Sequence, residues 1–141
     1  MIGRTFDTYS LDVEKGDLVR YAESAHMTSP PYTDEASARQ ARYGGLVAAP
    51  TYVIVMRILE AKVIAAFHAL IPYETSLDGG SEWSFFEPIR PGDRIDASAT
   101  LVNLYEREGK LGQMLFATMD IEYTNQFGRV VIKQRDTGIW Y

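Results

Sequence analysis

Cysteine is absent from this chain of 141 residues, and histidine occurs only twice, as His26 and His68. The lack of cysteine excludes disulfides, a thiol nucleophile and cysteine-ligated metal sites. Two histidines leave few groups for metal binding or acid–base chemistry, so neither a metal nor a cofactor is expected. A net charge of -5 with no cluster of Lys or Arg argues against a nucleic-acid partner.

Long apolar runs without charge are also missing. The N-terminus, MIGRTFDTYS, lacks the apolar core of a signal peptide. The longest apolar stretch, Tyr43–Ile71, is interrupted by Arg57, Glu60 and Lys62, so no membrane span is predicted. We therefore expect a cytoplasmic protein that forms a single domain over residues 1–141.

This apolar stretch is the feature around which the rest of the chain is expected to fold. Pro50 suits the first position of a helix, where a missing N–H costs nothing, and a proline directly follows the stretch. In between, Arg57, Glu60 and His68 occupy one narrow side at helical spacing, and most other positions are apolar. We predict one long central helix that is buried on most of its faces.

Shorter elements precede the central helix. Loose alternation predicts an edge strand over Thr5–Val13, and apolar spacing predicts short helices over Glu14–Ala25 and Glu35–Arg42. The segment between these helices, His26–Thr33, is predicted not to be helical because it contains two consecutive prolines.

The C-terminal half is predicted to be an antiparallel meander. A short apolar run predicts a strand at Ser84–Ile89, and alternation of apolar and polar residues predicts strands at Arg94–Tyr105 and Leu115–Tyr123. The last strand is expected at Val130–Tyr141. Turns are expected at Asp78–Gly80, Arg90–Asp93, Glu108–Lys110 and Asn125–Gly128. An antiparallel sheet wrapped around one long central helix is the α+β hotdog fold, which we expect here by analogy of pattern.

Four segments carry a further signal: SPPYTDEASARQARYGGLVAAPTY, GGSEWSFFEPIRPGDRI, the strand pair with EYTNQFGRVV, and the closing TGIWY. Together they resemble the MaoC-like dehydratase/hydratase superfamily, and within it the N-terminal MaoC or FAS1-like dehydratase domain branch. The resemblance runs nearly end to end. It implies a hotdog dimer that binds acyl-CoA or acyl-carrier thioesters. Catalytic members add water to the 2,3 double bond, or remove it, with R stereochemistry.

The resemblance also shows what this chain has lost. Alignment of the family's catalytic loop on Asp34 places the catalytic Asp position on Met27 and the catalytic His position on Tyr32. A methionine cannot accept a proton, and a tyrosine with an ordinary pKa of about 10 is a poor base at neutral pH. The two groups that would activate water are therefore replaced.

A second departure lies at the start of the central helix. Active members have a His-Gly pair there, and a backbone N–H polarises the thioester carbonyl. This chain has Ala49-Pro50, and proline has no N–H, although the Thr51 amide remains at the positive end of the helix. The resemblance thus implies a subunit of an R-type enoyl-CoA hydratase or 3-hydroxyacyl-thioester dehydratase. A catalytic MaoC-like partner would supply the missing dyad.

Two other functions stay open at this stage. The chain is alternatively a non-catalytic acyl-CoA-binding or assembly protein. It is otherwise a self-sufficient homodimeric hydratase or thioesterase that uses His26 with Tyr32. Homodimer and heteromer are both compatible with the sequence, which does not identify the acyl group.

Each candidate site residue has a functional and an ordinary interpretation. Ser29, Tyr43, Pro50 and Thr51 are candidates for binding substrate, or else are ordinary loop and helix-start residues. Arg90 and Arg94 flank a turn and are candidates for CoA phosphates, or else are solvated charges. We expect His68 to be a satisfied helix histidine, and we place Trp83, Phe85 and Phe86 in the core or a dimer interface.

Overall fold

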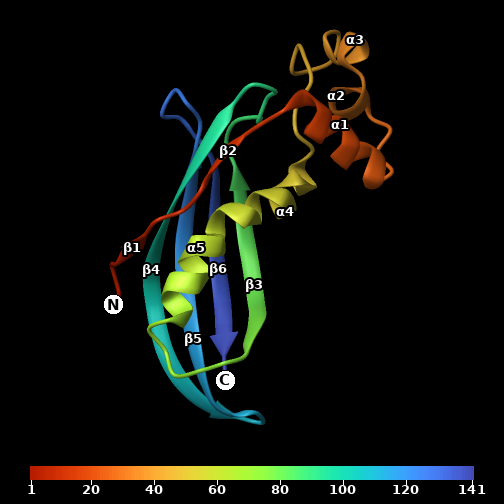
Figure 1. Cartoon of the computed structure of the whole chain (residues 1–141). Helices are drawn as coiled ribbons and strands as arrows, with labels where there is room; N and C mark the ends of the chain where they lie inside the picture. The colour runs from red at the N-terminus through yellow and green to blue at the C-terminus, as the bar shows by residue number, and fades with distance from the viewer.

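A computed structural model of the chain describes all 141 residues and confirms the α+β hotdog fold. One antiparallel sheet has the strand order β1-β4-β5-β6-β3, and β2 also pairs with β4 (Figure 1). The four long strands are β3 (Ser76–Phe85), β4 (Arg94–Gly109), β5 (Gly112–Thr124) and β6 (Val130–Trp140). The predicted first strand is split into β1 (Thr5–Phe6) and β2 (Ser10–Asp12).

Strand β3 is the largest difference from the predicted sheet. It begins at Ser76, eight residues before the predicted Ser84, and the Asp78–Gly80 segment is a bulge within it, not a turn. A Cβ on Gly79 would lie 2.7 Å from the carbonyl oxygen of Thr137, so only glycine fits there. The glycines of this segment, from which a turn was predicted, instead allow β6 to approach β3 closely.

The predicted type II turn at Arg90–Asp93 is confirmed. Gly92 has φ of +87°, and the Asp93 N–H donates to the Arg90 carbonyl at 3.1 Å. The Asp93 carboxylate is buried and accepts hydrogen bonds from Arg90 N–H at 2.8 Å and from Gln126 Nε2 at 3.0 Å. These bonds fix the turn against the β5–β6 connection.

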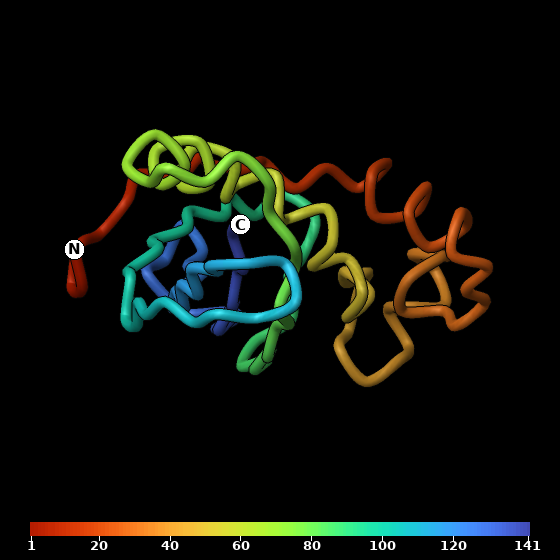
Figure 2. The backbone as a smooth tube through the Cα atoms, turned by 90° about the horizontal axis from the view of Figure 1, so that it is seen from below, coloured from red at the N-terminus to blue at the C-terminus, as the bar shows by residue number.

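The predicted central helix is a series of helical turns of two kinds. It consists of η1 (Pro50–Tyr52), α4 (Val53–Met56), η2 (Arg57–Glu60) and α5 (Ala61–His68), where η denotes a 3₁₀ turn. The prediction of burial on most faces is wrong. Figure 2 shows this helical segment as a layer over one face of the sheet. Met56, Leu59, Val63 and Phe67 face the sheet and are buried, whereas Ile54 and Ile58 are 60% and 63% exposed.

Three short helices, α1 (Lys15–Ser24), α2 (Pro30–Thr33) and α3 (Glu35–Ala38), lie beyond one end of the sheet (Figures 1 and 2). The two prolines do not prevent helix formation, because they occupy the first turn of α2, where their missing N–H groups have no helical partners. The Asp34 side chain caps α3 by accepting from Ser37 N–H at 2.8 Å. No helix of the chain is long and apolar enough to cross a membrane.

Beneath the helical segment, the core contains a buried polar cluster. The Tyr123 hydroxyl donates to Glu60 Oε1 at 2.7 Å and lies 2.6 Å from the Gln134 side-chain amide. Burial raises the pKa of Glu60 above its ordinary value, although the Tyr123 hydrogen bond and Arg57 act in the opposite direction. Burial and the neighbouring Glu60 also raise the pKa of Tyr123, so its hydroxyl is protonated. The His68 side chain has a hydrogen-bond partner, as predicted, because its Nε2 lies 2.7 Å from the Tyr73 carbonyl oxygen.

The raised pKa of Glu60 predicts how stability changes with pH. Folding favours the protonated carboxyl, so its contribution is fully present below the unfolded pKa of about 4.3 and is lost as pH rises through the higher folded pKa. The variant Glu60→Gln cannot ionise. Its free energy of unfolding should therefore increase relative to wild type as the pH rises above the unfolded pKa of about 4.3.

Urea unfolding at several pH values measures this difference. The exposed Glu108→Gln is the matched control and should track wild type. A constant difference between Glu60→Gln and wild type across the range would show that Glu60 ionises as readily folded as unfolded.

Candidate functional site

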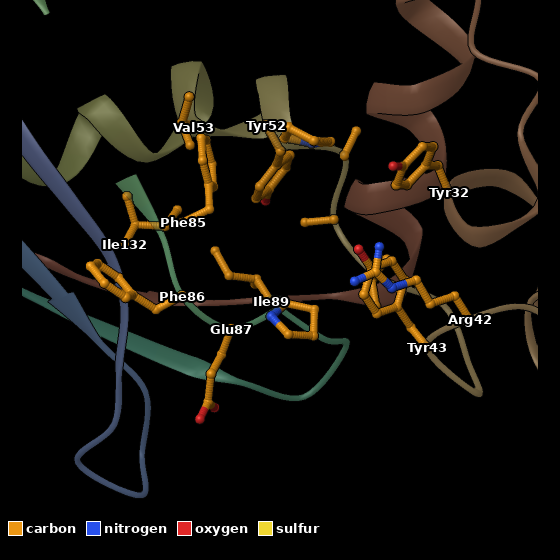
Figure 3. A pocket seen from close by; sticks show the side chains of 15 residues that line it. Tyr32, Arg42, Tyr43, Tyr52, Val53, Phe85, Phe86, Glu87, Ile89 and Ile132 are labelled. Carbon is orange, nitrogen blue, oxygen red and sulfur yellow. The ribbon is translucent and has the colours of Figure 1, made fainter. Parts of the chain in front are cut away.

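A pocket of about 390 Å³ lies where the chain enters the helical segment and passes the end of β3 (Figure 3). Its walls come from the connection between α3 and η1, from the first helical turns, and from β3 with the residues that follow it. Most of the lining side chains are apolar or aromatic, and they are Tyr32, Arg42, Tyr43, Val47, Ala48, Ala49, Pro50, Tyr52, Val53, Phe85, Phe86, Glu87, Pro88, Ile89 and Ile132.

Backbone hydrogen bonds hold the connection between α3 and η1 in place. Val47 N–H donates to the Pro31 carbonyl at 2.9 Å, and Ala48 N–H donates to the Ile89 carbonyl at 2.8 Å. The connection is therefore fixed between α2 and the segment after β3. Since Val47 and Ala49 are also buried, this side of the pocket is a rigid apolar wall.

Aromatic rings make up much of the remaining wall. Tyr52 is buried and packs edge-on against Tyr21 with ring centroids 5.4 Å apart, and burial raises the pKa of its hydroxyl. Phe85 and Phe86 are 52% and 58% exposed and border the pocket, so neither belongs to the core of this chain. The other half of the prediction, a place in a dimer interface, stays a prediction. Trp83 is different, because it is half-buried and stacks on Tyr123 at 6.1 Å.

Charge is sparse in the lining. Arg42 is the single cationic lining residue, and its guanidinium lies 5.4 Å from the centre of the Tyr43 ring. Glu87 is the single carboxylate, and Figure 3 shows its side chain directed away from the other labelled residues. Arg129 lies 3.8 Å from Glu87. Sequence reasoning missed Arg42, although its position directly before Tyr43 in the ARYGG run was a signal.

Three of the predicted site residues, Tyr32, Tyr43 and Pro50, line this pocket. His26 does not, because it follows the end of α1 as an exposed residue in a left-handed conformation with φ of +55°. Ser29 is also outside the lining, at the position that precedes α2. Thr51 is exposed, and its carbonyl accepts a hydrogen bond from the Tyr21 hydroxyl at 2.7 Å.

The two predicted phosphate-binding arginines have different surroundings. Arg90 lies beside the pocket and donates from its guanidinium to the Tyr43 carbonyl at 2.9 Å, which fixes the pocket rim. Arg94 lies on β4, between Asp12 at 3.8 Å and Asp96 at 3.9 Å. Carboxylates therefore already neighbour Arg94, whereas Arg90 and Arg42 give the rim a positive charge.

The arrangement suits binding better than proton transfer. The titratable lining groups are Arg42, Glu87 and the tyrosines Tyr32, Tyr43 and Tyr52, and no pair of them forms a carboxylate–histidine dyad. Met27, at the expected position of the catalytic Asp, is half-buried outside the lining. No group of three or more His, Asp or Glu side chains is placed to hold a metal ion.

Comparison with known proteins gives consistent findings. The family model described as FAS1-like, dehydratase domain region matches residues 1–134. A UPF0336 protein from Streptomyces griseus is 28% identical over 102 residues, which are 71% of this chain and 68% of that protein.

Two solved structures are similar over nearly their whole length. A MaoC-like dehydratase from Rhodospirillum rubrum has a TM-score of 0.80 at 25% identity, and the match covers 100% of this chain and 92% of that chain. A chain of the C-terminally truncated HadBC (3R-hydroxyacyl-ACP dehydratase) complex from Mycobacterium tuberculosis has a TM-score of 0.77 at 19% identity, over 98% and 96%. At 19% identity, the similarity to the HadBC chain shows only that the two chains share a fold.

A substitution that fills the pocket should weaken the binding of a ligand there. In the variant Ala48→Trp an indole fills part of the pocket, and if an acyl chain binds there the two compete for the same space. Binding of octanoyl-CoA should weaken about tenfold or more, because each CH₂ kept out of an apolar site forfeits about 0.8 kcal/mol. Titration calorimetry measures the affinity.

The matched control is Ala66→Trp, which adds the same ring at an exposed position of α5 that does not line the pocket. Equal affinity for both variants, with melting temperatures close to wild type, would show that no acyl chain binds in this pocket.

Proposed function

The chain belongs to the FAS1-like dehydratase domain family, and from this premise we propose that it is the thioester-binding subunit of an R-type enoyl-CoA hydratase or 3-hydroxyacyl-thioester dehydratase. The observation that carries the proposal is the composition of the pocket, which is apolar and has no acid–base pair. Hydration of an enoyl thioester needs two groups that converge on one water molecule. A chain with the pocket and without those groups binds the substrate and leaves proton transfer to a partner.

The two parts of an acyl thioester match two parts of this site. The aliphatic chain is buried against the wall formed by Val47, Ala49 and Tyr52, with Phe85 on the opposite side. The phosphates of CoA, or of the phosphopantetheine arm of a carrier protein, lie at the positive rim next to Arg42. Binding of this kind uses apolar area for affinity and a few charges for orientation.

The missing acid–base groups come from a catalytic MaoC-like partner in this proposal. Two unpartnered surfaces support a partner: the outer edge of β3, and the exposed apolar side of the helical segment that includes Ile54, Ile58 and Ile64. Apolar side chains of this size on one face of a helix are typical of an interface. The HadBC complex is an example of a hotdog dehydratase that contains two different chains.

A self-sufficient enzyme based on His26 has less support. The imidazole would have to act with Tyr32, but His26 is exposed beyond the end of α1, whereas Tyr32 lines the pocket. A thioester-binding protein that takes part in no turnover shares the pocket with our proposal and differs only in the absence of a catalytic partner.

Hydration of crotonyl-CoA by the purified chain tests the proposal. The rate should stay at background, because positioned acid–base groups contribute about 10²–10⁴-fold each. Co-expression with a MaoC-like chain that carries the intact motif should restore turnover.

The decisive control is His26→Ala in the otherwise unchanged chain. Robust hydration by the lone wild-type chain that is abolished in this variant would overturn the proposal and identify His26 as the base.

A further inference from the structure

A second pocket, of about 150 Å³, lies further along the helical segment, between α5 and the face of the sheet that this segment covers. Its lining includes Val63 and Phe67 from α5 and Trp140 from β6. It shares no lining residue with the first pocket, the one of about 390 Å³ at the start of the helical segment. The two cavities are therefore separated by other side chains.

The two pockets lie in line beneath the helical segment. On β6, Ile132 lines the first pocket and Asp136 lines the second. Residues four apart on a strand point to the same face and are about 13 Å apart, at about 3.3 Å per residue. The helical segment has the same order, with Val53 at the first pocket and Glu60 at the second.

Four side chains stand between the two pockets, and we call them the septum. Trp83 and Gln134 are cross-strand neighbours on β3 and β6, two residues beyond the β3 and β6 residues that line the first pocket. The Tyr123 ring stacks on Trp83, with ring centroids 6.1 Å apart. The Tyr123 hydroxyl lies 2.6 Å from the Gln134 amide and 2.7 Å from the Glu60 carboxyl.

Hydrogen bonds make the septum rigid. They join Glu60 of the helical segment to Tyr123 of β5 and Gln134 of β6, and all three residues are buried. A buried polar group that moves aside loses its partner and finds no water in exchange. An apolar chain end that presses on the septum therefore meets more resistance than it would meet from an aliphatic wall, which can repack.

Charged groups lie directly beyond the septum. The Arg57 guanidinium is 3.6 Å from Asp136 and 4.0 Å from Glu60, and all three residues line the second pocket. A methylene chain that entered here would displace these groups from one another and offer no hydrogen bond in return. The apolar surface available to a chain in the first pocket thus ends at the septum.

We infer that the septum fixes the length of the acyl group, so that the site accepts short and medium straight chains and excludes longer ones from the second pocket. This inference rests on the proposed function, which places the acyl chain in the first pocket. In this role Gln134 and Trp83 determine specificity, and Tyr123 and Glu60 hold Gln134 in position.

A series of straight-chain acyl-CoAs, from butanoyl to dodecanoyl, tests the limit on the wild-type chain. Titration calorimetry should show affinity that rises about tenfold for each added pair of CH₂ groups while the chain still fills the first pocket. Beyond the limit, the affinity should stay constant or fall, and dodecanoyl-CoA should bind no tighter than decanoyl-CoA. Affinity that still rises about tenfold at the last step would overturn the inference.

Substitution of Gln134 tests whether the septum sets this limit. Gln134→Ala removes the side chain beyond Cβ, so the first chain length past the wild-type limit should bind about tenfold tighter than it binds to wild type. Gln134→Met is the matched control, because it keeps an unbranched side chain of similar length and should keep the wild-type limit. The same limit in both variants, each with a cooperative melting transition, would overturn the inference.

The two tryptophans of the chain give a second measurement that leaves Gln134 unchanged. Trp83 belongs to the septum and Trp140 lines the second pocket. An acyl-CoA of the limiting length with bromine on its terminal carbon quenches a tryptophan that it touches. It should quench the fluorescence of Trp140→Phe, in which only Trp83 emits, and leave that of Trp83→Phe unchanged. Quenching of Trp140, or none of Trp83 at saturation, would overturn the inference.

The acyl-CoA series also separates the two claims. Saturable binding without a length limit counts against the septum alone and leaves the proposed function standing. Absence of saturable binding at every chain length counts against the proposed function, and the inference fails with it.

Discussion

The burial of one side of the helical segment Pro50–His68 against the sheet is the contact on which the other features depend. Met56, Leu59, Val63 and Phe67 form that side, at spacings of three and four residues. Because they anchor the segment, its first turn is held over the end of β3, where the pocket lies. Its middle turn is held over the β3 bulge, where Arg57 reaches Asp78.

The same contact separates the pocket from the buried polar cluster. The N-terminal end of the segment is surrounded by aromatic and apolar side chains, and Arg42 is the one cation among them. Its middle carries Arg57 and Glu60, which connect the helical layer to buried Tyr123 and to the edge strand. In the function we propose, a pocket that lacks acid–base groups leaves proton transfer to a different chain.

The fold could be predicted from the sequence because each pattern defines a whole element. Alternation of apolar and polar residues defines the strands, and the long apolar run defines the helical segment. It could not show which side of the apolar run is buried: Ile54 and Met56 are equally apolar, yet only Met56 meets the sheet. The Asp78–Gly80 segment was predicted as a turn because a bulge and a turn need the same residue types. Arg42 was missed because its place at the pocket depends on contacts between segments far apart in sequence.

Binding and turnover of one substrate, measured in one sample, test the central claim most directly. Titration of the purified chain with trans-2-octenoyl-CoA should give saturable heat, while the absorbance of the conjugated thioester stays constant after mixing. The pocket accounts for the binding, and the replacement of both acid–base groups accounts for the unchanged substrate. Steady loss of the conjugated absorbance, or no saturable heat at any concentration, would contradict the claim that this chain binds the thioester without transforming it.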